Sequence, residues 1–220
     1  MPKNKYITVA LDGAAGSGKS TTASLICKKY KYIHVDTGLH YRSLSLYFMT
    51  KNITADLVGN YLLKNTINLS SNIHGFSVEL LVDGQHYTPS QLRNDQMNSQ
   101  VSYYARLPEL RSLLLDYQRS LCTYGQNHGF SGIVMDGRDI GSVVLPDADL
   151  KIFLHADLSI RQHRRFIDGE KDSISGRDQI DSTRKIAPLT CPTGAISINT
   201  GSNSLEHVVE IISNRLLSLK

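Results

Sequence analysis

A glycine-rich segment near the N-terminus has the residue types needed to hold a chain of phosphates. Gly13-Ala-Ala-Gly-Ser-Gly-Lys19-Ser20 fits the pattern G-x-x-x-x-G-K-[ST] at every fixed position. Glycines let backbone N–H groups approach phosphate oxygens, the lysine reaches the β- and γ-phosphates, and the serine hydroxyl suits Mg²⁺. With glycine at about 7% of residues, the probability of a chance match in this chain is on the order of one percent. Binding of ATP or GTP is therefore the strongest inference, and the contact residues we expect are Gly13, Ala14, Ala15, Gly16, Ser17, Gly18, Lys19, Ser20 and Thr21.

The residues on either side of this loop predict the elements that must position it. Residues 6–11 form a nearly continuous apolar and β-branched run, which is typical of a strand covered on both faces. A helix is predicted to begin near Lys19. A phosphate loop needs this order of strand, loop and helix, so the local context supports the motif.

The rest of the chain continues the alternation of strands and helices. Further strands are predicted at 32–35, 132–135, 150–154 and 195–198, and helices at 40–50, 54–63, 89–124, 160–167 and 205–216. Asn203, with Glu206 three residues later, is the expected cap of the last helix. Residues 77–82 followed by Asp83-Gly84 predict a hairpin with its turn at that dipeptide. The pattern predicts an α/β fold: a parallel sheet with helices on both faces and an inserted small β/α subdomain.

Arginines and carboxylates gather after the predicted strands. Arg42 follows the second strand, and Met135-Asp-Gly-Arg-Asp139 follows the third. Ligands of open α/β sheets bind at the carboxyl ends of strands, so we expect these side chains to face a substrate. One of Asp136 and Asp139 could serve Mg²⁺ or a donor group of the substrate, although a turn capped by an aspartate would have the same sequence. No single spacing names the acceptor of the phosphoryl group.

Composition and charge limit the classes of partner. The chain has 220 residues, 24 Lys and Arg against 20 Asp and Glu, a formal net charge of +4, and 40% hydrophobic residues. This charge suits an anionic ligand, but the basic residues are scattered and form no stripe for nucleic acid. No apolar run approaches the ~18 residues of a membrane helix, and no signal peptide is apparent. We expect a cytoplasmic, monomeric protein without a nucleic-acid or membrane partner.

Six segments, in this order, together resemble the bacterial cytidylate kinases. They are residues 12–20, Val35-Asp-Thr-Gly-Leu-His-Tyr-Arg42, Leu107-Pro-Glu-Leu-Arg111 with Gln118-Arg119, residues 136–148 beginning Asp-Gly-Arg-Asp, Lys151-Ile-Phe-Leu154, and Gly176-Arg-Asp-Gln-Ile-Asp-Ser-Thr-Arg184 with Ala187-Pro-Leu189. The resemblance covers nearly the whole chain. It implies phosphoryl transfer from ATP to CMP, and to dCMP, with Mg²⁺ as cofactor and Ser20 as its ligand.

The resemblance also implies roles for individual residues. Arg42, Arg138 and Arg184 would hold the acceptor phosphate, and Thr37 and Tyr41 would line the monophosphate pocket. Ser102, Arg111 and Asp139 would contact cytosine, and Asp181 the sugar hydroxyl. Lys19, Arg138, Arg177 and Arg184 would form the catalytic set, with Arg177 in the lid.

The same resemblance divides the chain within a single domain of residues 1–220. The core would comprise 1–64, 106–168 and 185–220, the monophosphate-binding insertion about 65–105, and the lid about 169–184. The lid segment is shorter than the one the family usually carries.

Two other readings of the same residues remain open. One is a kinase for another small acceptor, either UMP or a metabolite alcohol, for which Asp136 or Asp139 could act as general base. The other is a non-catalytic nucleotide-binding module. Against a GTPase switch, the chain has no Asn-Lys-x-Asp run to read guanine.

Overall fold

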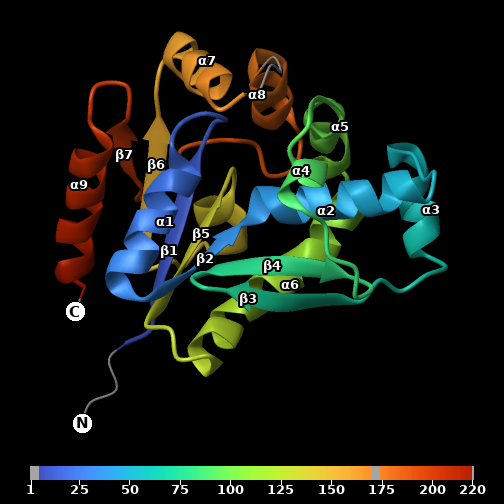
Figure 1. Cartoon of the computed structure of the whole chain (residues 1–220), viewed down its shortest axis with the longest axis horizontal. Coiled ribbons are helices and arrows are strands. Elements are labelled where there is room, and N and C mark those ends of the chain that lie inside the picture. Colours follow the sequence, from blue (N-terminus) through green and yellow to red (C-terminus); the bar gives the residue numbers. More distant parts are fainter. Residues whose placement is uncertain (1–4, 170–173, 220) are drawn as a thin grey trace.

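A mostly parallel sheet runs through the molecule, and the computed structural model describes residues 5–169 and 174–219 around it (Figure 1). Within these residues the sheet has seven strands in the order β3-β4-β2-β5-β1-β6-β7. The strands are β1 (Ile7–Gly13), β2 (Tyr32–Asp36), β3 (Leu69–His74), β4 (Ser77–Val82), β5 (Gly132–Gly137), β6 (Leu150–His155) and β7 (Ile196–Asn199). The β3/β4 pair is antiparallel, whereas the neighbours from β4 through β7 pair in parallel.

Helices connect the strands. They are α1 (Lys19–Tyr30), α2 (Thr37–Thr50), α3 (Val58–Leu62), α4 (Pro89–Leu92), α5 (Asp95–Ala105), α6 (Pro108–Asn127), α7 (Leu158–Ile167), α8 (Ile174–Thr183) and α9 (Leu205–Leu217), with a short 3₁₀ turn η1 (Ala55–Leu57) and a π-helical turn η2 (Ile140–Val144). These elements confirm the predicted α/β fold. The predicted 89–124 helix is divided into three. Asn94 caps α5 by accepting a hydrogen bond from the Met97 N–H, and Pro108 begins α6, because proline suits a helix start and not its interior.

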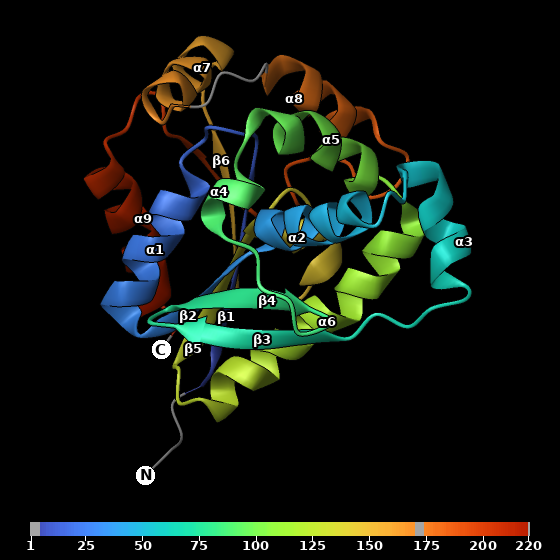
Figure 2. The same cartoon turned by 45° about the vertical axis from the view of Figure 1, so that its right-hand side comes forward.

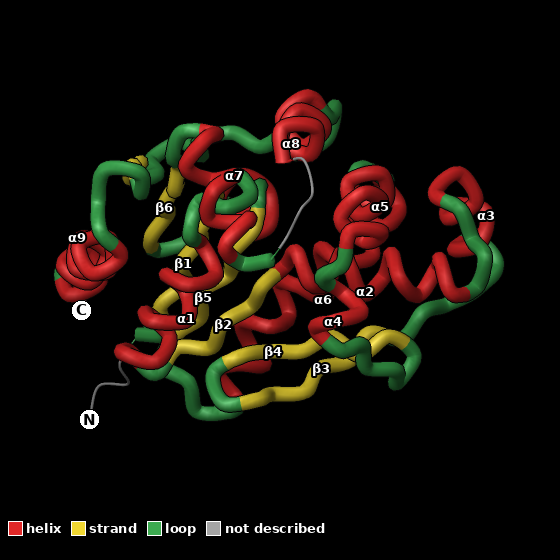
Figure 3. The backbone as a smooth tube through the Cα atoms, turned by 45° about the horizontal axis from the view of Figure 1, so that its top comes forward, coloured by secondary structure: helices red, strands yellow, loops and turns green. Residues whose placement is uncertain are grey.

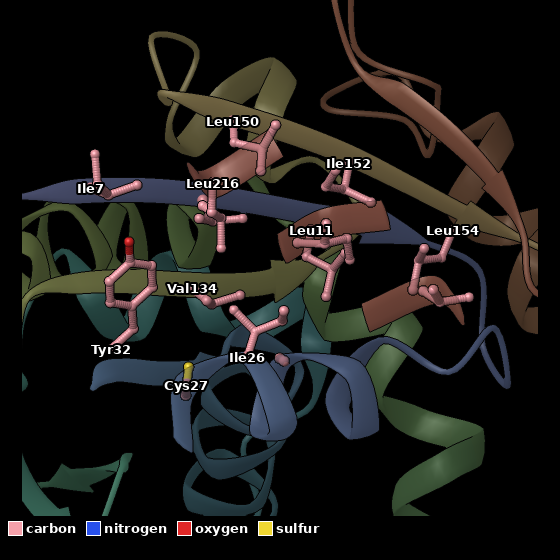
Figure 4. Packing of buried hydrophobic residues seen from close by; sticks show 14 of the residues in the cluster. Ile7, Leu11, Ile26, Cys27, Tyr32, Val134, Leu150, Ile152, Leu154 and Leu216 are labelled. Carbon is pink, nitrogen blue, oxygen red and sulfur yellow. The ribbon is translucent and has the colours of Figure 1, made fainter. Parts of the chain in front are cut away.

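The period-two pattern of β1 builds a core on each face of the sheet. Ile7, Val9 and Leu11 point to the face covered by α1 and α9, where Ile26 and Cys27 of α1 approach the strands (Figure 4). Ala10 points to the opposite face and joins a cluster with Leu121 of α6 and with residues of η2. Because both faces of the strand are buried, its sequence is a continuous apolar run.

The hairpin prediction placed the turn wrongly. Asp83 and Gly84 do form a tight turn with positive φ of 50° and 76°, closed by Val82 and Gln85, but no strand follows it. The hairpin that extends the sheet pairs β3 with β4 and turns at Gly75 instead. The Asp83 carboxylate accepts hydrogen bonds from the Asn68 backbone and the Tyr47 hydroxyl, which ties the chain to α2 and directs it away from the sheet.

The predicted cap of the last helix was wrong by one residue. Ser204 caps α9, since its hydroxyl accepts a hydrogen bond from the His207 N–H at 3.2 Å. Asn203 instead donates its side-chain amide to the Asn199 carbonyl at 2.7 Å. Both residues are good helix caps, so sequence spacing alone does not separate them.

The carboxyl ends of the parallel strands share one edge of the sheet. Helices α7 and α8 lie over this edge, beyond the ends of β1 and β6 (Figures 1 and 3). Figure 2 shows α5 beside α8, a neighbourhood that their backbone contacts confirm. The loops at this edge therefore meet two helical segments from different parts of the chain.

No helix in the described part of the chain is long and apolar enough to cross a membrane.

The core on the face packed by α1 and α9 should contribute strongly to stability, and Ile152 is a direct test because it is fully buried in β6. Ile152→Ala removes three buried carbons and leaves a cavity, so it should lower the free energy of unfolding by about 2–5 kcal/mol in urea titrations. Leu63→Ala, at a side chain that is 84% exposed, is the matched control and should have almost no effect. Equal effects for the two variants would contradict this description of the core.

Candidate active site

The segment between β1 and α1 is shaped by three glycines with positive φ. Gly13, Gly16 and Gly18 have φ of 152°, 72° and 89°, and Gly18 is the residue before the first turn of α1. A Cβ on Gly13 would lie 2.2 Å from the Leu154 carbonyl oxygen, and one on Gly16 would lie 2.7 Å from the Arg161 carbonyl oxygen. The loop therefore packs its backbone against β6 and α7, and the N-terminus of α1 opens toward the cavity beside it.

The Lys19 side chain folds back onto the backbone of this loop. Its ammonium group donates to the Ala14 carbonyl at 2.9 Å, and only 8% of the residue is exposed. Burial, reinforced by the nearby Arg138 charge, lowers the pKa of Lys19 to about 7. Phosphate oxygens beside the ammonium would favour its charged form and raise that pKa again.

A buried carboxylate stands behind the loop. Asp136, at the end of β5, accepts a hydrogen bond from the Ser20 hydroxyl at 2.8 Å and lies 3.2 Å from His34 Nε2. Its backbone carbonyl accepts from the Thr37 hydroxyl at 2.8 Å. Burial alone would raise the pKa of Asp136, but the His34 hydrogen bond and the Lys19 charge hold it below its usual value. This one residue thus connects α1, β2 and α2.

The residues expected to bind the acceptor come together at the same edge of the sheet. Eight of the nine line one cavity: Thr37, Tyr41, Arg42, Ser102, Arg138, Asp139, Asp181 and Arg184. The ninth, Arg111, forms a buried ion pair with Asp139 and lies over the Tyr41 ring at 5.5 Å. They come from α2, α5, α6, α8 and the segments that follow β5 and α8.

Ion pairs fill this acceptor cavity. Arg184 lies 3.4 Å from one Asp139 oxygen and 3.9 Å from one Asp181 oxygen. Arg138 Nε donates to Asp181 at 3.0 Å. Burial raises the pKa of Asp139 even beside two guanidinium groups. Buried charges of both signs are thus held together in this cavity.

Arg42 is fixed differently. Its guanidinium donates to the Leu92 carbonyl and to Asn98 Oδ1, each at 2.7 Å, so residues of the insertion hold it. The side chain of Arg177 lies outside the part of the chain that the structure describes, although its backbone belongs to α8.

Two further cavities, called here the middle and the outer cavity, share lining residues in series with the acceptor cavity. The middle cavity shares Gly38, Arg42, Gly137 and Arg138 with the acceptor cavity. The outer cavity, of about 410 Å³, shares Gly16, Lys19, Ser20, Arg93 and Arg165 with the middle one and is lined by Thr21 as well. The phosphate loop therefore lines both the outer and the middle cavity, and the middle cavity adjoins the acceptor cavity.

Several residues that line the outer cavity were not predicted to bind a ligand. Arg164 donates to the Thr200 hydroxyl and carbonyl at 3.0 and 2.7 Å, and Asn203 also lines this cavity. Arg93 lines both the outer and the middle cavity. Arg164 could have been found from the sequence, because it lies in the arginine-rich helix predicted at 160–167. For Arg93 the local sequence gives no such signal, because its position depends on the fold of the insertion.

The phosphate loop, the order of the parallel strands and the joined cavities define a phosphate-loop kinase. The cytidylate kinase family model matches residues 9–217, and the chain belongs to this family. It is 37% identical over 227 residues to the cytidylate kinase of Limosilactobacillus fermentum, covering 96% of each chain. It is 39% identical over 224 residues to the cytidylate kinase of Clostridium tetani, covering 96% of this chain and 94% of the relative.

Solved structures share the fold at low sequence identity. A sugar kinase from Janibacter sp. HTCC2649 matches with a TM-score of 0.51 and 12% identity, over 96% of this chain and 94% of its own. An uncharacterised protein from Eubacterium ventriosum matches with a TM-score of 0.52 and 12% identity, over 96% and 99% of the two chains. These likenesses concern the fold alone.

The two glycines Gly16 and Gly18 allow a test of the loop geometry. A Cβ at Gly18 meets nothing closer than 4.0 Å, so Gly18→Ala should lose about 1–2 kcal/mol from the left-handed backbone alone. Gly16→Ala should lose more, because its Cβ also collides with the backbone of α7. Urea unfolding of both variants measures the difference, and equal losses would mean that the loop does not pack on α7 as described.

Proposed function

We propose that this protein transfers the γ-phosphoryl group of ATP to CMP, giving ADP and CDP, and that dCMP is a second acceptor. The observation that carries the proposal is the single cavity lined by eight of the nine acceptor residues, joined to the phosphate loop through the middle cavity. Donor and acceptor phosphates bound there would face each other across Lys19. Family membership supports the same activity.

The acceptor phosphate would enter by exchanging partners with the buried arginines. The acceptor cavity measures about 60 Å³, well under the ~300 Å³ at the lower end of ordinary ligand pockets. Arg138 and Arg184 now pair with Asp181, and Arg184 also with Asp139. An incoming phosphate would replace these carboxylates, and the cavity walls would part to admit the nucleoside.

Base selection would rest on Asp139 and its neighbours. Cytosine has a 4-amino group where uracil has a carbonyl oxygen, so a carboxylate accepts a hydrogen bond from the one and repels the other. Arg111 holds the Asp139 carboxylate, and Ser102 lines the same cavity. A lost or mismatched buried hydrogen bond costs about 1–3 kcal/mol, which corresponds to roughly tenfold to hundredfold selection.

The chemistry needs no general base, since a phosphate oxygen of the acceptor is already an anionic nucleophile. Catalysis would consist of positioning and of charge stabilisation by Lys19, Arg138, Arg177 and Arg184. We assign acceptor binding to the insertion at 65–105, which supplies Ser102, and lid closure to 169–184, which supplies Asp181 and Arg184. Residues 170–173 of this lid lie outside the part of the chain that the structure describes. Closure would exclude water and so prevent hydrolysis of ATP. The monomeric state and the cytoplasmic location stay predictions from the sequence.

Ser20 and Asp136 have the donor atoms that suit Mg²⁺, a hydroxyl and a carboxylate 2.8 Å apart. The described residues include no group of three or more His, Cys, Asp or Glu that could hold a metal by themselves. That set fits Mg²⁺, which takes one or two protein ligands and completes its shell with phosphates and water. When bound, the ion would neutralise charge on the β- and γ-phosphates.

The direct test is release of ADP from ATP and Mg²⁺ with CMP, dCMP, UMP, AMP or GMP as acceptor. We expect CMP and dCMP to give turnover far above the other three. Lys19→Ala, which removes the cation of the loop, should lower turnover by about 10²-fold or more while circular dichroism stays unchanged. Preference for UMP or for an alcohol acceptor in the wild-type protein would contradict the proposal.

Asp139→Asn tests the reading of the base. An amide presents either a donor or an acceptor, so the ratio of kcat/KM for CMP to that for UMP should fall by about tenfold. Asp147→Asn, in an exposed turn after η2, is the matched control and should leave the ratio unchanged. An unaltered ratio in Asp139→Asn would remove this residue from base recognition.

A further inference from the structure

Arg93 stands where the donor and acceptor cavities meet. It directly follows α4 in the insertion, and it lines both the outer cavity beside the phosphate loop and the middle cavity toward the acceptor. The carbonyl of the preceding residue, Leu92, accepts a hydrogen bond from Arg42 at 2.7 Å. The backbone at Arg93 is thereby tied to an arginine of the acceptor site, while its side chain faces Lys19 and Ser20 across the same cavities.

The present partner of Arg93 is a carboxylate that an anion can replace. Its guanidinium donates to Asp36 Oδ2 at 3.2 Å, and its side chain is 47% exposed. By contrast, the side chains of Arg111 and Arg184 are 8% and 6% exposed and are held by buried carboxylates. Exposed ion pairs contribute little to stability and are screened by solvent, so Arg93 can leave Asp36 without unfolding its surroundings.

Asp36 itself favours such an exchange. It caps α2 through its other oxygen, which accepts from the Leu39 N–H at 3.2 Å, so its place is fixed whether or not Arg93 is bound. Phosphates entering the middle cavity would add negative charge beside Asp36, and a mobile guanidinium would move toward the stronger anion.

Resting on the proposed function, we propose that Arg93 is a further catalytic residue, which exchanges Asp36 for the phosphoryl group in transit. In the transfer step the bond from the γ-phosphorus to the β–γ bridging oxygen breaks, and a bond from that phosphorus to a CMP phosphate oxygen forms. The electron pair of the broken bond stays on ADP, and no proton has to move. Arg93 would stabilise the charge spread over the equatorial oxygens of the phosphoryl group in transit, a contact made in the transition state, so its effect falls on the rate of the step.

Steady-state kinetics of Arg93→Ala against ATP and CMP test this role. An interaction made mainly in the transition state lowers kcat with little change in KM, and we expect a loss in kcat of about 10²-fold. Arg93→Lys keeps the charge and should recover part of the loss. Arg106→Ala is the matched control, because Arg106 directly follows the insertion, is exposed and lies over the Tyr103 ring at 5.4 Å. It should behave as the wild type.

A double-mutant cycle that combines Arg93→Ala with Asp36→Asn distinguishes a catalytic role of Arg93 from a purely structural role of its ion pair with Asp36. The asparagine removes the charge of the ion pair but leaves the guanidinium of Arg93 in place, so its loss in kcat should be clearly smaller than that of Arg93→Ala. Equal losses in both single variants, with no further loss in the double variant, would assign the effect to the bridge and overturn the proposal.

The same kinetics distinguish failure of the role proposed for Arg93 from failure of the proposed function. A kcat for Arg93→Ala within about twofold of wild type, as in Arg106→Ala, would overturn the role of Arg93 and leave the proposed function standing. Failure of the wild-type protein to release ADP with CMP would overturn the proposed function, and this inference with it.

Discussion

The hydrogen bonds of one buried carboxylate hold the two halves of the site together. Asp136 accepts from Ser20 at the start of α1 and lies beside His34 of β2, and its backbone accepts from Thr37 at the start of α2. Burial would lower the pKa of His34, but the Asp136 partner raises it above its ordinary value, which favours a charged pair. Removing one member of a buried pair leaves the other charge uncompensated, so these contacts constrain one another. The phosphate loop and the acceptor cavity consequently keep a fixed relation.

A second buried carboxylate fixes the loop from the other side. Asp12, at the end of β1, accepts from the backbone N–H groups of Ile140 and Gly141 at 2.7 and 2.8 Å, so it ties the phosphate loop to the turn after Asp139. Burial raises the pKa of Asp12 to about 6, against these two hydrogen bonds. Burial therefore disfavours the charged form of Asp12 more than these hydrogen bonds favour it. In the proposed mechanism, the arginines of the acceptor cavity and Arg93 change partners around this frame.

The sequence predicted the parts of the site that depend on local backbone chemistry. The glycines of the loop and the start of α1 at Lys19 follow from a motif whose spacing is set by phosphate geometry. The acceptor residues were predicted through a resemblance, and their gathering in one cavity depends on carboxyl ends of parallel strands lying at one edge.

The parts that the sequence did not predict depend on contacts between distant segments. Asp83-Gly84 has the composition of a hairpin turn and forms one, but the contact of Asp83 with Tyr47 directs the chain elsewhere. Asn203 and Ser204 are equally plausible caps until the loop after β7 engages Asn203. Arg93 carries no local signal, because its importance comes from the two cavities that the insertion brings together.

Donor and acceptor phosphates are expected to bind in one continuous space. Calorimetric titration with a bisubstrate analogue, in which five phosphates join the 5′ carbons of adenosine and cytidine, tests this claim most directly. If the cavities are joined as described, the second half binds at a high effective concentration, and the analogue should bind about 10²-fold or more tightly than ATP. An affinity no greater than that of ATP, in a protein that still binds CMP, would show that the two sites are separate and contradict the account.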